Sequence, residues 1–443
     1  MGRAALVLAR RRRRAAAALL ALLAGLLGGC GAPDGDADGD AGGVVRLRFQ
    51  SLAWQKESVD ANRALVAEWN AGHPRVRVEY VQGSWSSVHD QLLTSFEGGE
   101  APDVIHDASD DLADFAHGGY LADLRPLLSD RLRADIPAAS WESVTFGAEG
   151  GVYGVPFLQE PRVLMANTGL LRAAGVRIPT SEAPWSWEEF RTAARQLTTE
   201  GRYGVAWPLK DPVSATLNLG LSAGGRLFRR DAAGKAVIRW AEGDAVVPGT
   251  VRAMTGTDHS ASRATLGMGG SDTLPGFFGG RYAMVPLGFS YRQQIARQAP
   301  PGFEWQVLPP PAGTDGLVQG VSPQTLSIAR DSPHKKEAAA FLDFLLSPAN
   351  TVRLALGDWM LPTSARALAD PALHTPDLGW STGTALAAGL RPAPAPSVRG
   401  YPEWKDKVAT PALQEYYSGA IDLAELEERL VRDGNRVLAR YQR

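Results

Sequence analysis

The sequence predicts an α/β protein in which strands and helices alternate, and three observations carry this prediction. Short β-rich stretches at 44–49, 76–80 and 103–106 are separated by segments with apolar residues on one helical face. The chain has 443 residues, of which 44% are hydrophobic, so it is long enough for two or three domains with buried cores. Its 21% of charged residues and formal net charge of −2 are typical of a globular protein, and they disfavour nucleic-acid partners.

The N-terminus has the layout of an export signal. Arg3 and Arg10–Arg14 form a basic region, an uncharged run spans 15–29, and small residues precede Cys30. The run Leu27-Gly28-Gly29-Cys30 resembles the bacterial lipobox, in which the cysteine becomes the lipidated first residue of the mature protein. We therefore predict a signal peptide over 1–29 and a lipid on Cys30. The alternative is a free or buried thiol behind an ordinary signal, and both general and twin-arginine export remain open.

Cys30 is the only cysteine, which excludes a disulfide framework and a thiolate zinc site within the chain. Residues 30–43 are rich in glycine and aspartate and contain no large apolar residue, so we predict a flexible tether. No second apolar run of about 18 residues follows.

The first half of the folded part repeats a strand, a loop and a helix. The strand at 44–49 leads into a loop with Trp54 and Gln55, and the strand at 76–80 leads into a loop with Trp85. The third strand is followed by the acidic segment 107–111. Such βαβ units form parallel sheets, and ligands bind beyond the carboxyl ends of the strands, where these loops lie.

The second half repeats the α/β pattern. Tyr153–Pro156 is short, extended and ended by proline, which predicts a strand that passes between two lobes. A strand is expected at 163–167, and Ser186 with Glu189 forms the capping box of a helix. Amphipathic helices are expected at 335–346 and 423–441.

Taken in order, these features resemble the extracellular solute-binding proteins of ABC transporters, in the carbohydrate-binding family that includes maltose-binding protein. The matching segments are GGEAPDV (98–104), GGYLADLRPLL (118–128), YGVPF with Glu160 and Asn167, WSWEEF (185–190), FFGGRYAMVPLG (277–288) and AAAFLDFLLSPANTVRLALG (338–357). The resemblance implies a two-lobe periplasmic-binding-protein-like fold of type II, with discontinuous lobes joined by hinge strands. We expect lobe 1 to comprise 44–155 plus 283–322, and lobe 2 to comprise 156–282 plus 323–443.

A saccharide needs flat rings against its C–H faces and polar groups for its hydroxyls. Among the 12 tryptophans, those in loops or at strand ends are the candidate platforms, and the alternative for each is packing within a lobe. The candidates are Trp54, Trp85, Trp207, Trp359 and Trp404, together with Tyr401, because YPEW (401–404) matches the place where sugar-binding relatives present an aromatic residue.

Carboxylates are the second group of candidates because they accept hydroxyl hydrogen bonds with charge assistance. Glu160 matches the position of a ligand-binding carboxylate beside the hinge in the family, with a salt bridge to Arg162 as the alternative. Asp107, Asp110 and Asp111 are further candidates, and the alternative is that they only cap and start a helix. Gln55 and Ser290 are weaker polar candidates.

The sequence thus predicts a monomeric, lipid-anchored binding protein on the outer face of the cytoplasmic membrane. It would capture a carbohydrate by hinge closure and deliver it to ABC permease subunits, with no cofactor, no metal and no catalysis. The alternatives are a secreted carbohydrate-active enzyme and a binding protein for another solute such as a polyol phosphate. An arginine cluster facing the cleft would favour the phosphate. The minimal motifs of esterases, zincins and nucleotide hydrolases do not occur in the sequence.

Overall fold

The computed structural model describes residues 43–147, 149–393 and 398–442. The expected signal peptide, Cys30 and the tether up to residue 42 lie outside the described residues. Val44–Arg443 form one unit by their contacts, and all elements below belong to it. Within the part of the chain that the structure describes, no helix is both long and apolar enough to cross a bilayer.

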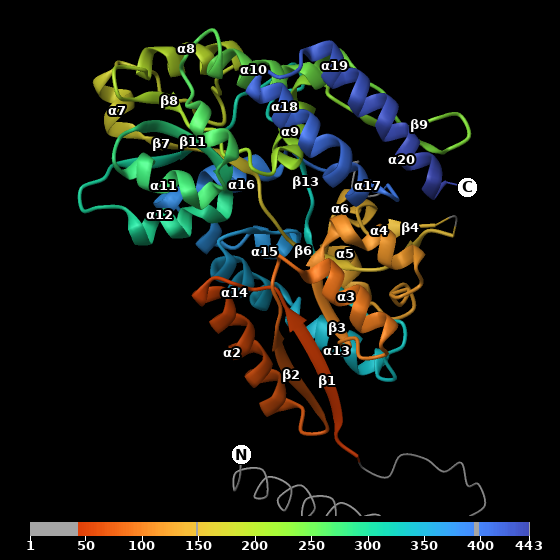
Figure 1. The fold of residues 1–443 in the computed structure, drawn as a ribbon. Coiled ribbons are helices and arrows are strands. Elements are labelled where there is room, and N and C mark those ends of the chain that lie inside the picture. Colours follow the sequence, from red (N-terminus) through yellow and green to blue (C-terminus); the bar gives the residue numbers. More distant parts are fainter. Residues whose placement is uncertain (1–42, 148, 394–397, 443) are drawn as a thin grey trace, which may run out of the picture. The chain divides into compact units, whose positions relative to one another are not determined.

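The first lobe is built on a six-stranded sheet with the order β15-β6-β14-β3-β1-β2 (Figure 1). Its strands are β1 (Val45–Ser51), β2 (Val76–Gln82), β3 (Val104–Ala108), β6 (Val155–Gln159), β14 (Gln324–Ile328) and β15 (Leu361–Pro362). β1 pairs in parallel with β2 and β3, as the βαβ pattern predicts. The remaining pairs, β14 with β3 and β6 and β15 with β6, are antiparallel, so the sheet is mixed.

Helices and loops cover both faces of this sheet, and its central strands are accordingly buried on both sides. α2 buries Asn62, Leu65, Val66 and Trp69, which are spaced along one helical face. The first-lobe helices are α2 (Lys56–Gly72), α3 (Val88–Glu97), α4 (Ser109–His117), α5 (Asp130–Asp135), α6 (Ala138–Glu142), α13 (Lys335–Leu345), α14 (Pro348–Asp358) and α15 (Ala365–Leu368). The short hairpin β4 (Thr145–Phe146) with β5 (Gly151–Val152) lies beside α4.

The second lobe is built on a four-stranded sheet with the order β12-β7-β11-β8. Its strands are β7 (Arg162–Asn167), β8 (Tyr203–Val205), β11 (Tyr282–Gly288) and β12 (Trp305–Leu308). The helices around it are α7 (Thr168–Ala173), α8 (Trp187–Leu197), α9 (Pro212–Gly220), α10 (Val246–Thr255), α11 (Gly270–Phe278), α12 (Arg292–Gln298), α16 (Trp380–Ala387), α17 (Tyr401–Trp404), α18 (Thr410–Ser418), α19 (Leu423–Glu428) and α20 (Gly434–Tyr441). The capping box predicted for Ser186 and Glu189 is present at the start of α8.

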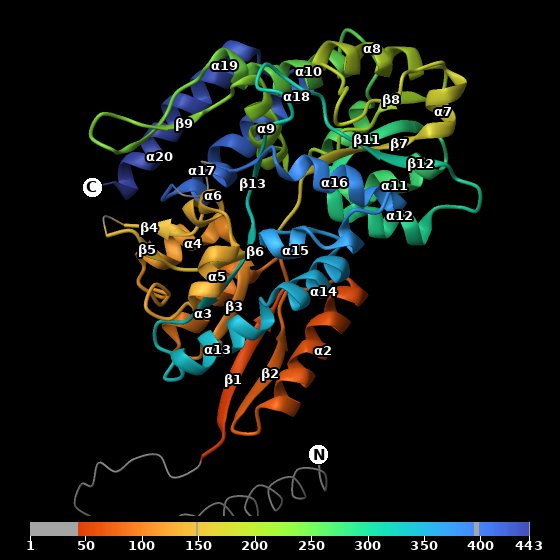
Figure 2. The ribbon, with the colours of Figure 1, turned by 180° about the vertical axis from the view of Figure 1, so that it is seen from behind.

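The chain passes between the two sheets three times, which gives the two-lobe arrangement in Figures 1 and 2. The first passage is at Glu160–Pro161, between β6 and β7, so the predicted hinge strand ends at Gln159, three residues later than expected. The second runs from β12 to β14 through β13 (Gln319–Val321), and the third runs from α15 to α16. β13 pairs with β16 (Leu390–Pro392) and forms a ribbon at the crossing.

The sheet pairing differs from the expected lobe boundaries. β11, expected in the first lobe, pairs with β7 and β8 of the second sheet. β14, expected in the second lobe, lies between β3 and β6 of the first sheet. Each of these strands hydrogen-bonds to two strands that are far from it in sequence. The lobe to which it belongs is therefore set by long-range pairing, which a local sequence pattern does not reveal. The strand returning to the first lobe is therefore β14, some 40 residues later than β11.

The apolar core is continuous through the crossing region. One cluster covers one face of the first sheet beneath α3 and α4, and another covers the outer face of the second sheet. The largest cluster contains Phe49 of β1 together with Met165 of β7 and Val285 of β11. It therefore joins the two sheets, and the lobes share one core at the hinge.

Candidate ligand-binding site

The candidates from the first two loops lie where β1 and β2 end. Trp54 lies two residues before α2 and is 57% exposed, so its indole is available to a partner. Gln55 is buried beside it, and its Oε1 atom has no hydrogen-bond partner among the described residues. Trp85 is half-buried and contacts the His106 ring edge to face, with 5.5 Å between the centroids.

His106 ties together three of the strands that end here. Its Nδ1 accepts a hydrogen bond from the Leu52 N–H at 3.0 Å, so Nε2 carries the proton and donates to Gln324 Oε1, also at 3.0 Å. Burial lowers the pKa of His106 to about 4. The imidazole is therefore neutral near pH 7, and it positions the ends of β1, β3 and β14.

Asp107, Asp110 and Asp111 come together at the start of α4. Asp107 is 1% exposed; its Oδ1 accepts the Ala108 N–H, and its Oδ2 has no partner within the described chain. Asp110 likewise encloses an Oδ1 atom without a partner among those residues, whereas Asp111 binds His89 Nδ1 at 2.9 Å. Burial raises the pKa of Asp107 and of Asp110, and the charge of Asp111 raises both further.

The second lobe faces this acidic cluster with α17 and the segment after it. Tyr401 is buried, and burial together with the charge of Asp110 raises its pKa. Ser322, at the second crossing, and the charge of Lys405 both act on the Asp110 carboxyl and lower its pKa, against the larger effect of burial. Acids from the first lobe and a phenol and a lysine from the second thus meet across the crossing.

Glu160 and Ser290 meet on the other side of the crossing. Glu160 follows β6, and its Oε2 accepts the Ser290 N–H at 3.0 Å. A Cβ atom at Gly288 would lie 2.5 Å from Glu160 Oε2, so only glycine allows β11 to approach this carboxylate so closely. The alternative partner, Arg162, forms no ion pair with Glu160 within 4 Å in the part of the chain that the structure describes.

Trp359 lies against a buried arginine that the sequence did not single out. Arg292 of α12 is fully buried and donates to the carbonyl oxygens of Phe289 and Leu378 at 2.7 Å and of Trp359 at 3.0 Å. Its guanidinium carbon is 4.1 Å from the Trp380 ring centroid and 5.4 Å from that of Trp359. Trp359 has a φ of +56°, a strained conformation for a bulky residue that brings its carbonyl to Arg292.

Asp358 and α12 complete this side of the crossing. Burial and, to a smaller extent, the nearby charge of Glu160 raise the pKa of Asp358 to about 6. α12 also contacts the first lobe directly, because Gln293 Nε2 donates to Glu57 Oε2 at 2.7 Å and Arg297 forms an ion pair with Glu57. Contacts between the lobes are thus present both beside the acidic cluster at the start of α4 and beside Glu160 and Ser290.

Trp207 and Trp404 lie in the core of the second lobe. Trp207 is 2% exposed and packs edge to face on Phe190, and its Nε1 has no partner among the described residues. Trp404 is 1% exposed, its Nε1 donates to the Leu430 carbonyl at 3.3 Å, and its ring packs on Phe228. In this conformation neither indole offers a free face to a ligand.

Sequence reasoning missed Arg292, Asp358, Ser322 and Lys405. Arg292 and Asp358 were invisible because a charged residue in a helix is normally solvated, and no pattern marks a buried one. Lys405 is half-buried, and only the fold brings it near Asp110. Ser322 could have been found, since it directly precedes Pro323 at the crossing into β14. No group of three or more His, Cys, Asp or Glu side chains that could hold a metal occurs in the described ranges.

The arrangement suits hydroxyl recognition. Gln55 Oε1, Asp107 Oδ2 and Asp110 Oδ1 are enclosed oxygen atoms without a partner in the described chain. An unsatisfied buried polar group costs about 1–3 kcal/mol, and a ligand hydroxyl that donates to it removes this cost. Two α/β lobes joined by crossing strands, with polar groups gathered at the crossing, define the class of two-lobe solute-binding proteins.

Comparisons with known proteins agree with this class. Residues 54–352 match the model of the bacterial extracellular solute-binding protein family, and the chain belongs to that family. A lipoprotein in the oleD 5′ region of Streptomyces antibioticus is 70% identical over 408 residues, which cover 92% of this chain and 89% of that protein.

Solved structures share the fold at low sequence identity. The GacH receptor of Streptomyces glaucescens, solved unliganded and with acarbose, has a TM-score of 0.74 at 22% identity and covers 89% of this chain and 99% of its own. The sugar-binding protein MalE from Xanthomonas citri has a TM-score of 0.76 at 22% identity, with 90% and 98% covered. These likenesses establish the type of fold that the sequence predicted, with two lobes and discontinuous segments.

Proposed function

We propose that this protein is the lipid-anchored binding subunit of an ABC importer that captures an oligosaccharide between its two lobes and delivers it to the permease. The family places it among extracellular solute-binding proteins. The lipoprotein relative supports the anchor on Cys30, and the sugar-binding relatives of the same fold support the ligand class. It would act by binding alone, without catalysis.

The observation that carries the proposal is the set of enclosed, unpartnered oxygen atoms on Gln55, Asp107 and Asp110 among the described residues. Together with the exposed indole of Trp54, they match a neutral ring compound with many hydroxyls. A ligand that contacts these groups and Tyr401 or Lys405 binds both lobes, so it favours the closed arrangement by its contacts in that state.

Calorimetric titration of the purified protein against mono-, di- and longer oligosaccharides, acarbose included, tests this function. We expect binding by at least one oligosaccharide and about tenfold weaker binding after Asp107→Asn or Trp54→Ala, since about 1.4 kcal/mol corresponds to a factor of ten. Glu79→Gln, which neutralises an exposed acid on β2, is the control and should bind as the unaltered protein does.

Two results would contradict the proposal. One is the absence of binding across the whole panel, and the other is the release of shorter products on long incubation, which would favour the enzyme alternative. The anchor is tested separately with Cys30→Ser, which we expect to release the exported protein from membranes into the medium.

A further inference from the structure

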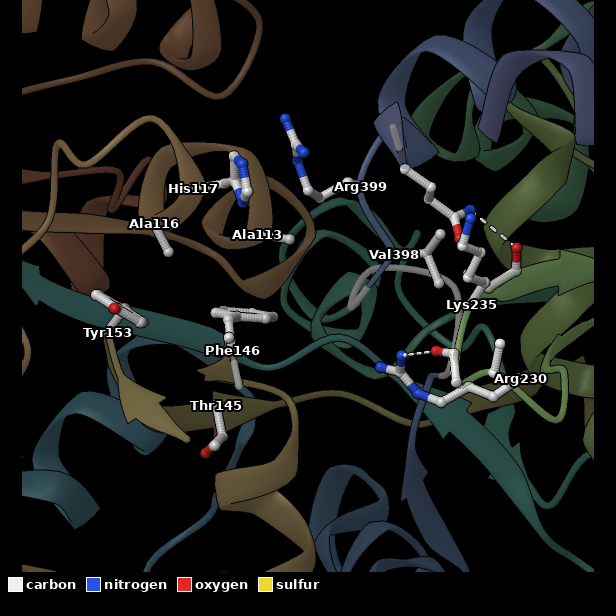
Figure 3. A pocket seen from close by; sticks show the side chains of 15 residues that line it. Ala113, Ala116, His117, Thr145, Phe146, Tyr153, Arg230, Lys235, Val398 and Arg399 are labelled. Carbon is white, nitrogen blue, oxygen red and sulfur yellow. Dashed lines mark hydrogen bonds between the residues drawn. The ribbon is translucent and has the colours of Figure 1, made fainter. Parts of the chain in front are cut away.

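A cavity outside the acidic cluster lies between the two lobes. It has a volume of about 540 Å³, within the usual range of about 300–1,000 Å³ for ligand pockets. The first lobe contributes the end of α4 and the β4–β5 hairpin, and the second lobe contributes the hairpin of β9 (Phe228–Arg230) and β10 (Ala236–Ile238) with the segment before α17 (Figure 3). Neither the sequence motifs nor the proposed oligosaccharide site accounts for it.

Four basic residues line this cavity, namely His117, Arg230, Lys235 and Arg399, and none of the lining residues that the structure describes is an aspartate or a glutamate. Within the described residues, none of these four has a carboxylate oxygen within 4 Å, although most ion pairs of the protein involve arginine. Arg230 and Arg399 instead donate to the carbonyl oxygens of Gly234 at 2.9 Å and Tyr441 at 2.7 Å. Neutral carbonyls orient both side chains, and within the described residues no carboxylate holds either guanidinium at ion-pair distance.

The acids nearest to the cavity do not neutralise it. Asp231 lies in the turn of the β9–β10 hairpin, where its Oδ1 accepts the N–H groups of Ala233 and Lys235 at 2.9 Å. The charge of Arg399 lowers the pKa of Asp114 in α4, but burial raises that pKa by more. Among the described residues, Lys235 and Arg230 therefore line the cavity without a carboxylate within 4 Å of their charged groups.

Aromatic rings form the first-lobe side of the same cavity. Phe146 and Tyr153 stack with their centroids 6.3 Å apart and an interplanar angle of 26°. Tyr153 lies tightly against β5, because a Cβ atom at Gly151 would be 2.7 Å from its hydroxyl. Figure 3 shows these two rings on the side opposite Arg230 and Lys235. A sugar ring placed in the cavity can stack on Phe146 and Tyr153 and present a negative group to Arg230 and Lys235.

We propose that this cavity is a second binding site that accepts a saccharide bearing an anionic substituent, a carboxylate or a phosphate. The ring of the saccharide would stack on Phe146 and Tyr153, and the anion would bind Lys235 and Arg230. The charge pattern along α4 separates this site from the oligosaccharide site. Asp110 and Asp111 lie in the first turn of the helix, whereas Ala113, Ala116 and His117 line the cavity. An anionic group is repelled at the first end and attracted at the second.

Titration of the purified protein with four probes tests this inference: an oligogalacturonate, a neutral oligosaccharide of the same length, glucose 6-phosphate and inorganic phosphate. We expect one of the acidic saccharides to bind at least tenfold more tightly than the neutral one, with an affinity that falls as salt is added. Lys235→Gln and Arg230→Gln should each weaken this binding about tenfold and leave binding of the neutral oligosaccharide unchanged.

The matched control is Arg229→Gln, which removes an exposed charge from the same strand at a position that does not line the cavity. Phosphate binding that depends on Lys235 would also support the anion site and would identify a free anion as a ligand. The inference is overturned if the acidic saccharides bind no better than the neutral one, or if Arg229→Gln weakens them as much as Lys235→Gln. It concerns a separate site, so binding of neutral sugar alone would refute it and leave the proposed function intact.

Discussion

Neutralising Asp358 by the Asp358→Asn substitution should stabilise the protein at neutral pH. Asp358 is 4% exposed and is the last residue of α14, where the helix dipole also disfavours a negative charge. Burial raises its pKa from 3.8 to about 6. At 1.36 kcal/mol per pKa unit, this rise of roughly two units corresponds to about 3 kcal/mol.

The direction of the effect follows from proton linkage. A carboxyl with a higher pKa in the folded than in the unfolded chain favours folding in its protonated form, so the folded state loses stability as the pH rises from about 4 to about 6. His106 acts in the opposite direction, because its pKa is lowered from 6.5 to about 4 and acid therefore favours the unfolded chain. The two effects oppose each other over a similar pH range, so the difference between variant and unaltered protein isolates Asp358.

Urea unfolding followed by tryptophan fluorescence at pH 4 and pH 7.5 measures this difference. We expect Asp358→Asn to raise the free energy of unfolding by up to about 3 kcal/mol at pH 7.5 and to change it little at pH 4. The control Glu79→Gln, on an exposed position, should stay within about 0.5 kcal/mol at both values. An equal increment at both pH values, or a loss of stability at pH 7.5, would refute the argument from burial.

Two further predictions concern the contacts between the lobes. Gly288→Ala places a Cβ atom against the Glu160 carboxylate, so the Glu160 side chain must move. We expect calorimetry to show about tenfold weaker oligosaccharide binding. An unchanged affinity would mean that Glu160 does not contact the ligand. Glu57→Gln breaks the ion pair with Arg297 across the lobes, and we expect a larger radius of gyration by small-angle X-ray scattering without ligand. Glu68→Gln, whose partner Arg353 lies in the same lobe, is the control, and identical scattering of the two variants would contradict a role for Glu57 in holding the lobes together.

Much of the local structure could be predicted because it depends on local patterns. The strand at 76–80, the capping box of α8 and the buried face of α13 follow from side-chain periodicity and capping chemistry, and the structure confirms them. The lobe boundaries could not be predicted in the same way. β14 reaches the first sheet by pairing with strands about 170 and 220 residues earlier in the chain, and nothing in its five residues encodes those partners.

The positions of those candidate residues that lie at the end of a strand could be predicted from the sequence. Trp54 and Gln55 follow β1 and Asp107 lies at the end of β3, and the structure places these strand ends at one edge of the sheet. The placement of Trp404 could not be predicted, because the burial of an aromatic residue in α17 depends on distant partners such as Leu430. The burial of Arg292 could not be predicted either, because two of its three carbonyl partners lie 67 and 86 residues away in the sequence. The roles of the site residues in binding stay predictions.

The central position of β14 has a consequence for the newly made chain. Until residues 324–328 are available, β3 and β6 each keep an open edge of unpaired N–H and C=O groups, and the first-lobe sheet is split in two. A nascent chain that has emerged only to β12 therefore cannot complete either its first lobe or the core shared at the hinge. Ribosome-bound fragments ending before β14 should thus remain sensitive to proteases, and protection of the first lobe should appear only once residues 324–328 have emerged.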